Sequence, residues 1–164
     1  MKPETRNQEH NEKRRGQLML YAPLIIWIGV IFFLSSGQGS STRTSIIIRP
    51  ILEFLFPSAS FETISLYHGV IRKFAHFTEY AVLGALACRA FVGSSGNFLR
   101  NHYYLAAGVL VLLVAGSDEF NQSFNPERTS SPVDAMIDLC GGLTAIVFYY
   151  FFGRRRDQAS SLSV

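Results

Sequence analysis

The chain has 164 residues, of which 48% are hydrophobic and 16% are charged, and its formal net charge is +3. Soluble domains carry about a quarter charged residues, and here the apolar residues fall in blocks, so the composition argues against a water-soluble core and against disorder. The length leaves room for one domain, and the two cysteines form no CxxC pair, which excludes a disulfide scaffold and a cysteine-built zinc site.

Four mostly apolar segments are candidates for transmembrane helices, since crossing a bilayer takes about 20 such residues in a helix. The first, residues 18–36, holds no charge and is longer than the ~7–15 apolar residues of a signal peptide, so we expect it to be retained as a membrane helix. The second covers residues 74–92, the third residues 99–117 and the fourth residues 133–152. The sequence therefore predicts an all-α, polytopic membrane protein with four transmembrane helices.

The first loop contains a further apolar stretch, residues 46–56, which is too short to span a membrane. Arg49, Pro50 and Glu53 interrupt it. This pattern predicts a short interfacial or re-entrant helix in the first outer loop.

The two ends of the chain are polar. We expect a disordered basic cytoplasmic tail over residues 1–17 and a basic, serine-rich cytoplasmic tail over residues 154–164. The four-helix transmembrane domain lies between them, over residues 18–153.

Lysines and arginines are unevenly divided between the two sides that four spans define, and this bias sets the orientation in the membrane. The side of the termini has ten, which are Lys2, Arg6, Lys13, Arg14, Arg15, Arg89, Arg100, Arg154, Arg155 and Arg156. The other side has five, which are Arg43, Arg49, Arg72, Lys73 and Arg128. We therefore expect both termini in the cytoplasm. Anionic lipid headgroups attract basic tails of this kind. We therefore expect the lipid bilayer as a partner, and we do not expect a nucleic acid.

Ionisable residues gather at the outer end of the second helix, where Arg72 and Lys73 precede the apolar segment, while Arg89 lies near its cytoplasmic end. Arg72, His76 and Glu79 are separated by four and three residues, so they share one helix face. A charged side chain near the middle of a bilayer costs at least about 2.5–3.5 kcal/mol, and less near the interface. A hydrated pocket on this face would lower that cost.

The third and fourth segments carry polar residues at the same depth. Asp134 and Asp138 are four residues apart, and Asp118 and Gln122 repeat this spacing if the third helix continues through Phe120. We expect these side chains to face those of the second helix across one pocket at the outer boundary.

Small residues predict that the second and fourth helices pack closely. Gly84 and Ala85 lie in the second segment, and Gly141 and Gly142 lie in the fourth. Such residues allow the backbones of two membrane helices to approach each other.

The expected pocket carries more negative than positive charge. Its cations are Arg72, Lys73 and Arg128, and its carboxylates are Glu79, Asp118, Glu119, Asp134 and Asp138. Because carboxylates in a low dielectric cannot all remain ionised, a proton, a divalent cation or bound water has to help. His76 could donate a proton, accept one or ligate a metal.

The polar motifs resemble those of the VanZ-like family of small bacterial membrane proteins. They are K-F-A-H-F-T-E-Y-A-V-L-G at 73–84, S-D-E-F-N-Q-S-F at 117–124, E-R at 127–128 and D-A-M-I-D-L-C-G-G at 134–142. The resemblance covers about residues 72–152, and it departs at 125–128, where a proline-glycine turn before the arginine is commoner in the family. It implies a multi-pass protein of the bacterial cytoplasmic (inner) membrane. Through the family's namesake it also implies an association with low-level resistance to the glycopeptide teicoplanin, without a settled reaction.

One hypothesis is that the protein binds or modifies a lipid-linked or cell-envelope component near the outer leaflet. The candidates for acid–base chemistry are His76, Glu79, Asp118, Glu119 and Asp138. The candidates for binding an anionic ligand or orienting these groups are Arg72, Lys73, Gln122, Arg128 and Asp134. The same carboxylates could hold a divalent cation.

Two alternatives remain. In the first, the protein is a non-catalytic accessory or binding subunit, and the same residues form a structural network. The second is proton or ion translocation, which the inner halves of the helices disfavour because they offer no matching polar relay. Whether the protein is an enzyme stays open.

Overall fold

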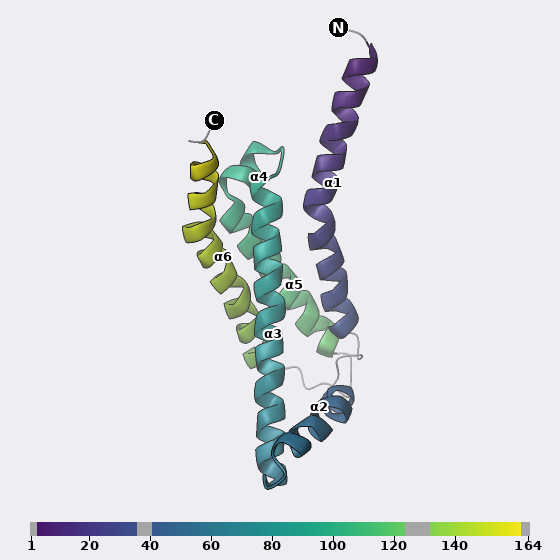
Figure 1. Ribbon diagram of the computed structural model, residues 1–164, viewed down its shortest axis with the longest axis vertical. Helices are drawn as coiled ribbons and strands as arrows, with labels where there is room; N and C mark the ends of the chain where they lie inside the picture. The colour runs from purple at the N-terminus through teal and green to yellow at the C-terminus, as the bar shows by residue number, and fades with distance from the viewer. Residues whose placement is uncertain (1–2, 36–40, 124–131, 162–164) are drawn as a thin grey trace.

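The computed structural model describes the backbone of residues 3–35, 41–123 and 132–161, and within these the side chains of residues 15–35, 45–121 and 133–153. The regular elements of these ranges are all helices: α1 (Pro3–Phe33), α2 (Ser41–Leu55), α3 (Phe61–Val92), α4 (Asn97–Asn101), α5 (Tyr103–Ser123) and α6 (Pro132–Ser161). The start of α1 and the end of α6 lie at the same end of the molecule, and α2 lies at the other end (Figure 1). The all-α prediction is confirmed.

The central helix is α3, which contacts α1, α2, α4, α5 and α6. It begins at Phe61, where the Ser60 hydroxyl accepts a hydrogen bond from the backbone N–H of Thr63 at 3.3 Å. Its 32 residues extend over about 48 Å. The sequence predicted a segment that began at residue 74, whereas α3 begins at Phe61. The first turns of α3 include polar residues, so apolar character alone did not reveal them.

Glycines bring α3 and α6 close together. A Cβ atom at Gly84 would lie 2.5 Å from the carbonyl oxygen of Gly142, and one at Gly141 would overlap the carbonyl oxygen of Phe77. A larger residue at either glycine would therefore push one backbone away from the other. The predicted close approach is confirmed at Gly84, Gly141 and Gly142.

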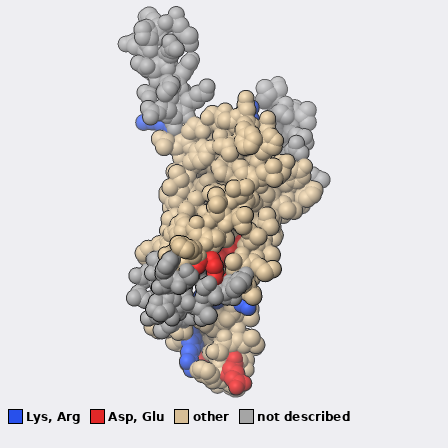
Figure 2. Space-filling model, turned by 180° about the vertical axis from the view of Figure 1, so that it is seen from behind, with Lys and Arg blue, Asp and Glu red and all other residues tan. Residues whose placement is uncertain are grey.

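The core lies where α1, α3 and α5 meet beside α6. Ile31, Tyr80, Leu83 and Val111 are at most 1% exposed. Large apolar side chains on the outward faces are exposed, as helices in contact with lipid require. Figure 2 shows one such face, on which an uncharged band covers most of the surface and acidic side chains emerge near its lower edge.

Three described helices are long and apolar enough to cross a membrane by length and composition. The matching stretches are Arg15–Phe33 in α1, Tyr103–Asn121 in α5 and Val133–Gly153 in α6. The prediction of four such helices is thus confirmed in part, since α3 does not meet the criterion. His76, Glu79 and Arg89 lower its mean hydropathy.

The helices extend beyond the apolar segments. Helix α1 begins at Pro3, within the tail predicted for residues 1–17, and α6 ends at Ser161, within the tail predicted for residues 154–164. Glu, Gln, Lys and Arg, which are good helix formers, populate these extensions. The helix expected in the first loop is present as α2, and α5 continues through Phe120 as the spacing of Asp118 required.

The predicted third segment, residues 99–117, is divided between two helices. The short α4 ends at Asn101. The backbone torsion angles of the next residue, His102, are φ −118° and ψ 32°, which are not helical, and α5 begins at Tyr103. The apolar pattern alone did not reveal this break.

Candidate functional site

A pocket of about 150 Å³ lies between α1, α2, α3 and α5. Both apolar and polar or charged residues line it. The apolar residues are Ile31, Leu34, Ile48, Ile71 and Ala75, and the polar ones are Ser35, Arg72, His76, Glu79 and Asp118. We call this site the polar pocket.

The polar pocket brings together residues from separate helices. Arg72, His76 and Glu79 project from one face of α3, as their spacing predicted, and Asp118 reaches the same space from α5. Both α3 and α5 carry ionisable groups at the level of the pocket. The pocket therefore reduces the number of charges that would otherwise face lipid.

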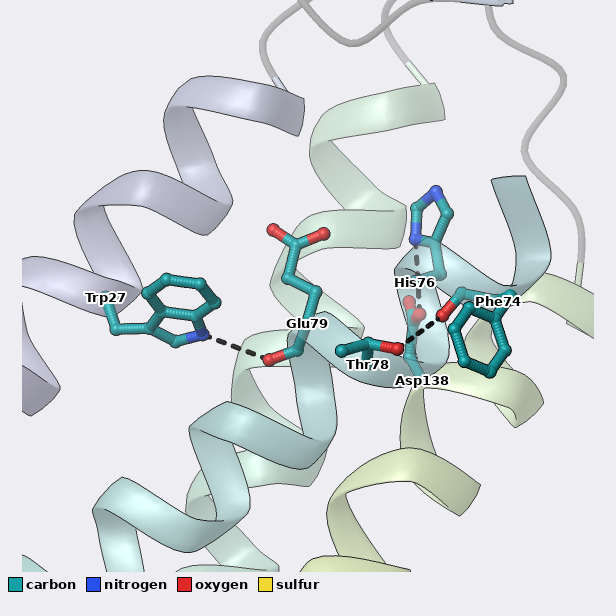
Figure 3. A network of polar contacts seen from close by, with 6 residues as sticks. All are labelled: Trp27, Phe74, His76, Thr78, Glu79 and Asp138. Carbon is teal, nitrogen blue, oxygen red and sulfur yellow. Dashed lines mark hydrogen bonds and ion pairs between the residues drawn. The ribbon is translucent and has the colours of Figure 1, made fainter. Parts of the chain in front are cut away.

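His76 contacts a carboxylate of a third helix, with which it forms an ion pair when its imidazole is protonated. Its Nδ1 atom lies 3.2 Å from Oδ1 of Asp138 on α6, and the two side chains are 14% and 4% exposed. The other ring nitrogen points away from Asp138 (Figure 3). Asp138 therefore fixes the orientation of an imidazole that also lines the polar pocket.

Electrostatic interactions extend this pair into a network. His76 interacts with Glu79 and Arg72, and Asp138 interacts with Asp118 and Asp134. Asp118 and Asp138 are only 2% and 3% exposed. Buried carboxylates require compensating partners. His76 is that partner for Asp138, whereas Asp118 and Asp134 carry the same charge as Asp138 and repel it.

Tyr80 belongs to this network, and the sequence analysis missed it. Its side chain is 0% exposed, and it interacts electrostatically with Glu79, Asp118 and Asp138. It lies four residues after His76 on the same face of α3. That spacing was the available signal, but an aromatic residue in an apolar helix resembles an ordinary core residue.

A hydrogen bond from a side chain of α1 to the backbone of α3 holds the two helices together beside the pocket. The indole Nε1–H of Trp27 donates a hydrogen bond to the backbone carbonyl oxygen of Glu79 at 3.0 Å (Figure 3). On α3, the Thr78 hydroxyl donates to the carbonyl oxygen of Phe74 at 2.8 Å. The first contact fixes α1 against the turn of α3 that carries Glu79.

The other predicted site residues whose side chains the structure describes do not line the polar pocket. Lys73 is exposed on another face of α3, and Glu119 and Asp134 are partly buried. Asp134 acts at a distance, through its interaction with Asp138. The side chain of Gln122 and the whole of Arg128 lie outside the described residues.

The described side chains do not form a site for a metal ion. In residues 15–35, 45–121 and 133–153, no three His, Cys, Asp or Glu side chains are grouped as a metal site would require. Cys88 and Cys140 are both free, the first buried and the second exposed.

A family model described as VanZ/LLP1 matches residues 20–153. The chain belongs to this family. The match confirms the resemblance carried by the polar motifs and extends it to the first apolar helix, which those motifs do not include. No curated protein and no solved structure matches the chain. Together with the three apolar helices, the family identifies a VanZ-family membrane protein.

Proposed function

We propose that this VanZ-family protein binds a lipid-linked or other cell-envelope component at the outer face of the bacterial cytoplasmic membrane. The observation that carries this proposal is the composition of the polar pocket. Arg72, Glu79 and Asp118 line it together with isoleucines from α1, α2 and α3. Such a wall suits an amphipathic ligand, with its polar group beside Arg72 and its hydrocarbon against the isoleucines.

The proposed orientation requires α3 to act as a fourth membrane crossing beside α1, α5 and α6. Its length of about 48 Å exceeds the ~30 Å hydrocarbon core of a bilayer. An even number of crossings agrees with the start of α1 and the end of α6 at one end of the molecule (Figure 1). The excess of lysine and arginine near the termini favours a cytoplasmic location for that end.

Each polar group then has a distinct role. The guanidinium of Arg72 binds a phosphate or carboxylate of the ligand, because its planar donors match such groups. His76 presents one ring nitrogen for proton transfer while Asp138 holds the other. Glu79 and Asp118 accept hydrogen bonds from hydroxyl or amine groups of the ligand.

The family association with teicoplanin resistance fits an envelope ligand of this kind. A deletion strain is expected to be more susceptible to teicoplanin than its parent, and complementation with the full chain should restore the difference. If the two strains are equally susceptible to teicoplanin, the protein has no role in resistance to it.

A second candidate function is that of a non-catalytic accessory subunit. The ion pair between His76 and Asp138, together with the bond from Trp27 to the Glu79 carbonyl, favours it because these contacts join α1, α3 and α6. In that case the polar residues fix helix positions, and a partner protein docks on the assembled bundle.

Lipid retention and membrane abundance distinguish the two candidates. Arg72→Gln removes the guanidinium that lines the polar pocket. The control is Arg100→Gln, which removes an exposed arginine of α4. That arginine donates a hydrogen bond to Asn97 and lies far from the pocket. We expect Arg72→Gln to reach normal abundance but to co-purify with less envelope lipid by mass spectrometry, and Arg100→Gln to match the parent. Loss of abundance in Arg72→Gln would support the structural role, and unchanged lipid retention would contradict the binding role.

A further inference from the structure

A second, smaller cavity of about 60 Å³ lies between α2 and the first half of α3. Ser45 and Arg49 line it from α2, and Phe61, Ile64, Ser65 and His68 line it from α3. We call it the α2–α3 cavity. It shares no lining residue with the polar pocket.

The polar residues of this cavity come from two facing helix surfaces. Ser45 and Arg49 are four residues apart on α2, and Ser65 and His68 are three apart on α3, so each pair occupies one face. Together they supply one permanent cation, two hydroxyl groups and an imidazole. Hydrogen-bond donors therefore predominate, which favours an anionic ligand rich in oxygen.

Two contacts hold the guanidinium of Arg49 in place. Its Nε atom lies 2.8 Å from Oε1 of Glu53, and its central carbon lies 4.6 Å from the centre of the Phe61 ring. The bond to Glu53 uses one of the five N–H donors of the guanidinium. Arg49 is thus oriented by protein contacts and retains donors for a ligand.

His68 provides a separate indication of a ligand. Its Nε2 atom is buried, and no hydrogen-bond partner for it exists among the described residues. Buried polar atoms are rarely left without a partner, since the loss of water is then uncompensated. A group that enters the cavity from outside would satisfy this nitrogen.

We infer that the α2–α3 cavity binds the phosphate group of a membrane lipid. The volume exceeds the ~10–15 Å³ that a single water needs, so a small oxyanion is a suitable occupant. The opposite face of α2 exposes Ile47 and Phe54 by 68% and 85%, and Ile46 beside it is exposed by 70%. An amphipathic helix of this kind lies with its apolar face at the acyl-chain boundary, which places its polar face at the level of the headgroups.

This inference does not rest on the proposed function, because it uses a different cavity and different residues. It assigns α2 a lipid-anchored position beside the polar pocket, which Ile48 of the same helix also lines. Failure of phosphate binding here would leave the polar pocket and its ligand unaffected.

The test uses the full chain with ¹⁵N-labelled histidine in micelles of an uncharged maltoside detergent. Three probes are added separately: short-chain phosphatidylglycerol, inorganic phosphate, and short-chain diacylglycerol, which lacks the phosphate. The readout is the ¹⁵N resonance of His68, assigned by its absence in His68→Gln. We expect saturable shifts with phosphatidylglycerol at lower concentrations than with inorganic phosphate, and none with diacylglycerol.

The matched variants are Arg49→Gln and Arg100→Gln. We expect Arg49→Gln to weaken phosphatidylglycerol binding about tenfold, as the loss of charge-assisted hydrogen bonds does, and Arg100→Gln to bind as the parent does. An unchanged His102 resonance and gel-filtration profile show that the Arg49 variant is folded. If it is not folded, the three probes on the unmodified chain decide the matter.

Several results would overturn the inference. The first is no His68 shift with any probe, and the second is an equal shift with diacylglycerol, which would indicate an apolar slot. Equal affinity for inorganic phosphate and phosphatidylglycerol would refute the lipid as the source of the phosphate. Unweakened binding by folded Arg49→Gln would refute the site itself.

Discussion

Nδ1 of His76 on α3 lies 3.2 Å from Oδ1 of Asp138 on α6. This pair depends on the close helix packing next to it, because Gly141 follows Asp138 by three residues and lies against the carbonyl oxygen of Phe77, the residue after His76. The glycine contact brings the two backbones together, and the short side chains can then meet. Helix packing and the chemistry of the site are therefore linked at one level of the bundle.

The His76–Asp138 pair is expected to show energetic coupling. We predict that His76→Gln and Asp138→Asn each destabilise the protein, whereas the double variant loses little more than the worse single variant. The coupling free energy should be about 1–3 kcal/mol, because either substitution alone breaks the pair. Unfolding of the purified proteins in mixed micelles measures it. Additive losses would show that the two residues do not interact.

Glycine 84 offers a test of the contact between α3 and α6. Gly84→Ala places a methyl group against the backbone of Gly142 and should cost about 1–3 kcal/mol. Gly108→Ala on α5 is the matched control, since a Cβ atom there meets no neighbour within 4 Å. Thermal unfolding in detergent should show a lower Tm for the first variant and an unchanged or higher Tm for the second. Equal Tm values for both variants would contradict the close packing.

The contact between α1 and α3 is tested at Trp27. Trp27→Phe keeps an aromatic ring but removes the N–H that donates to the carbonyl oxygen of Glu79. We expect a loss of about 0.5–1.5 kcal/mol, the usual contribution of one hydrogen bond. Trp27→Leu should lose more, because ring packing is removed as well. A Phe variant as stable as the parent would show that the bond contributes nothing.

Much of this arrangement could be predicted from the sequence. The spacing of Arg72, His76 and Glu79 fixes their common helix face, and three apolar segments identify α1, α5 and α6. The glycines at 84 and 141 marked the contact between α3 and α6, because close helix approach needs residues without side chains.

Other features depend on three-dimensional contacts that spacing does not contain. Helical spacing places Lys73 about 100° around α3 from Arg72, but it does not tell which of the two directions faces the polar pocket. Tyr80 resembles a core residue until its carboxylate neighbours are known. The pairing of His76 with Asp138, rather than with another carboxylate, follows from the relative depth of α3 and α6.

The proposed function requires the polar pocket to open on the side of the membrane away from the cytoplasm. Ala75 lines that pocket and is exposed, so Ala75→Cys in a background lacking Cys88 and Cys140 reports its accessibility. Arg100→Cys, on α4 near the opposite end, reports the other side. With a membrane-impermeant maleimide on intact spheroplasts, we predict labelling of Ala75→Cys and none of Arg100→Cys until the cells are lysed. Labelling of Ala75→Cys only after lysis, together with labelling of Arg100→Cys in intact spheroplasts, would contradict the account.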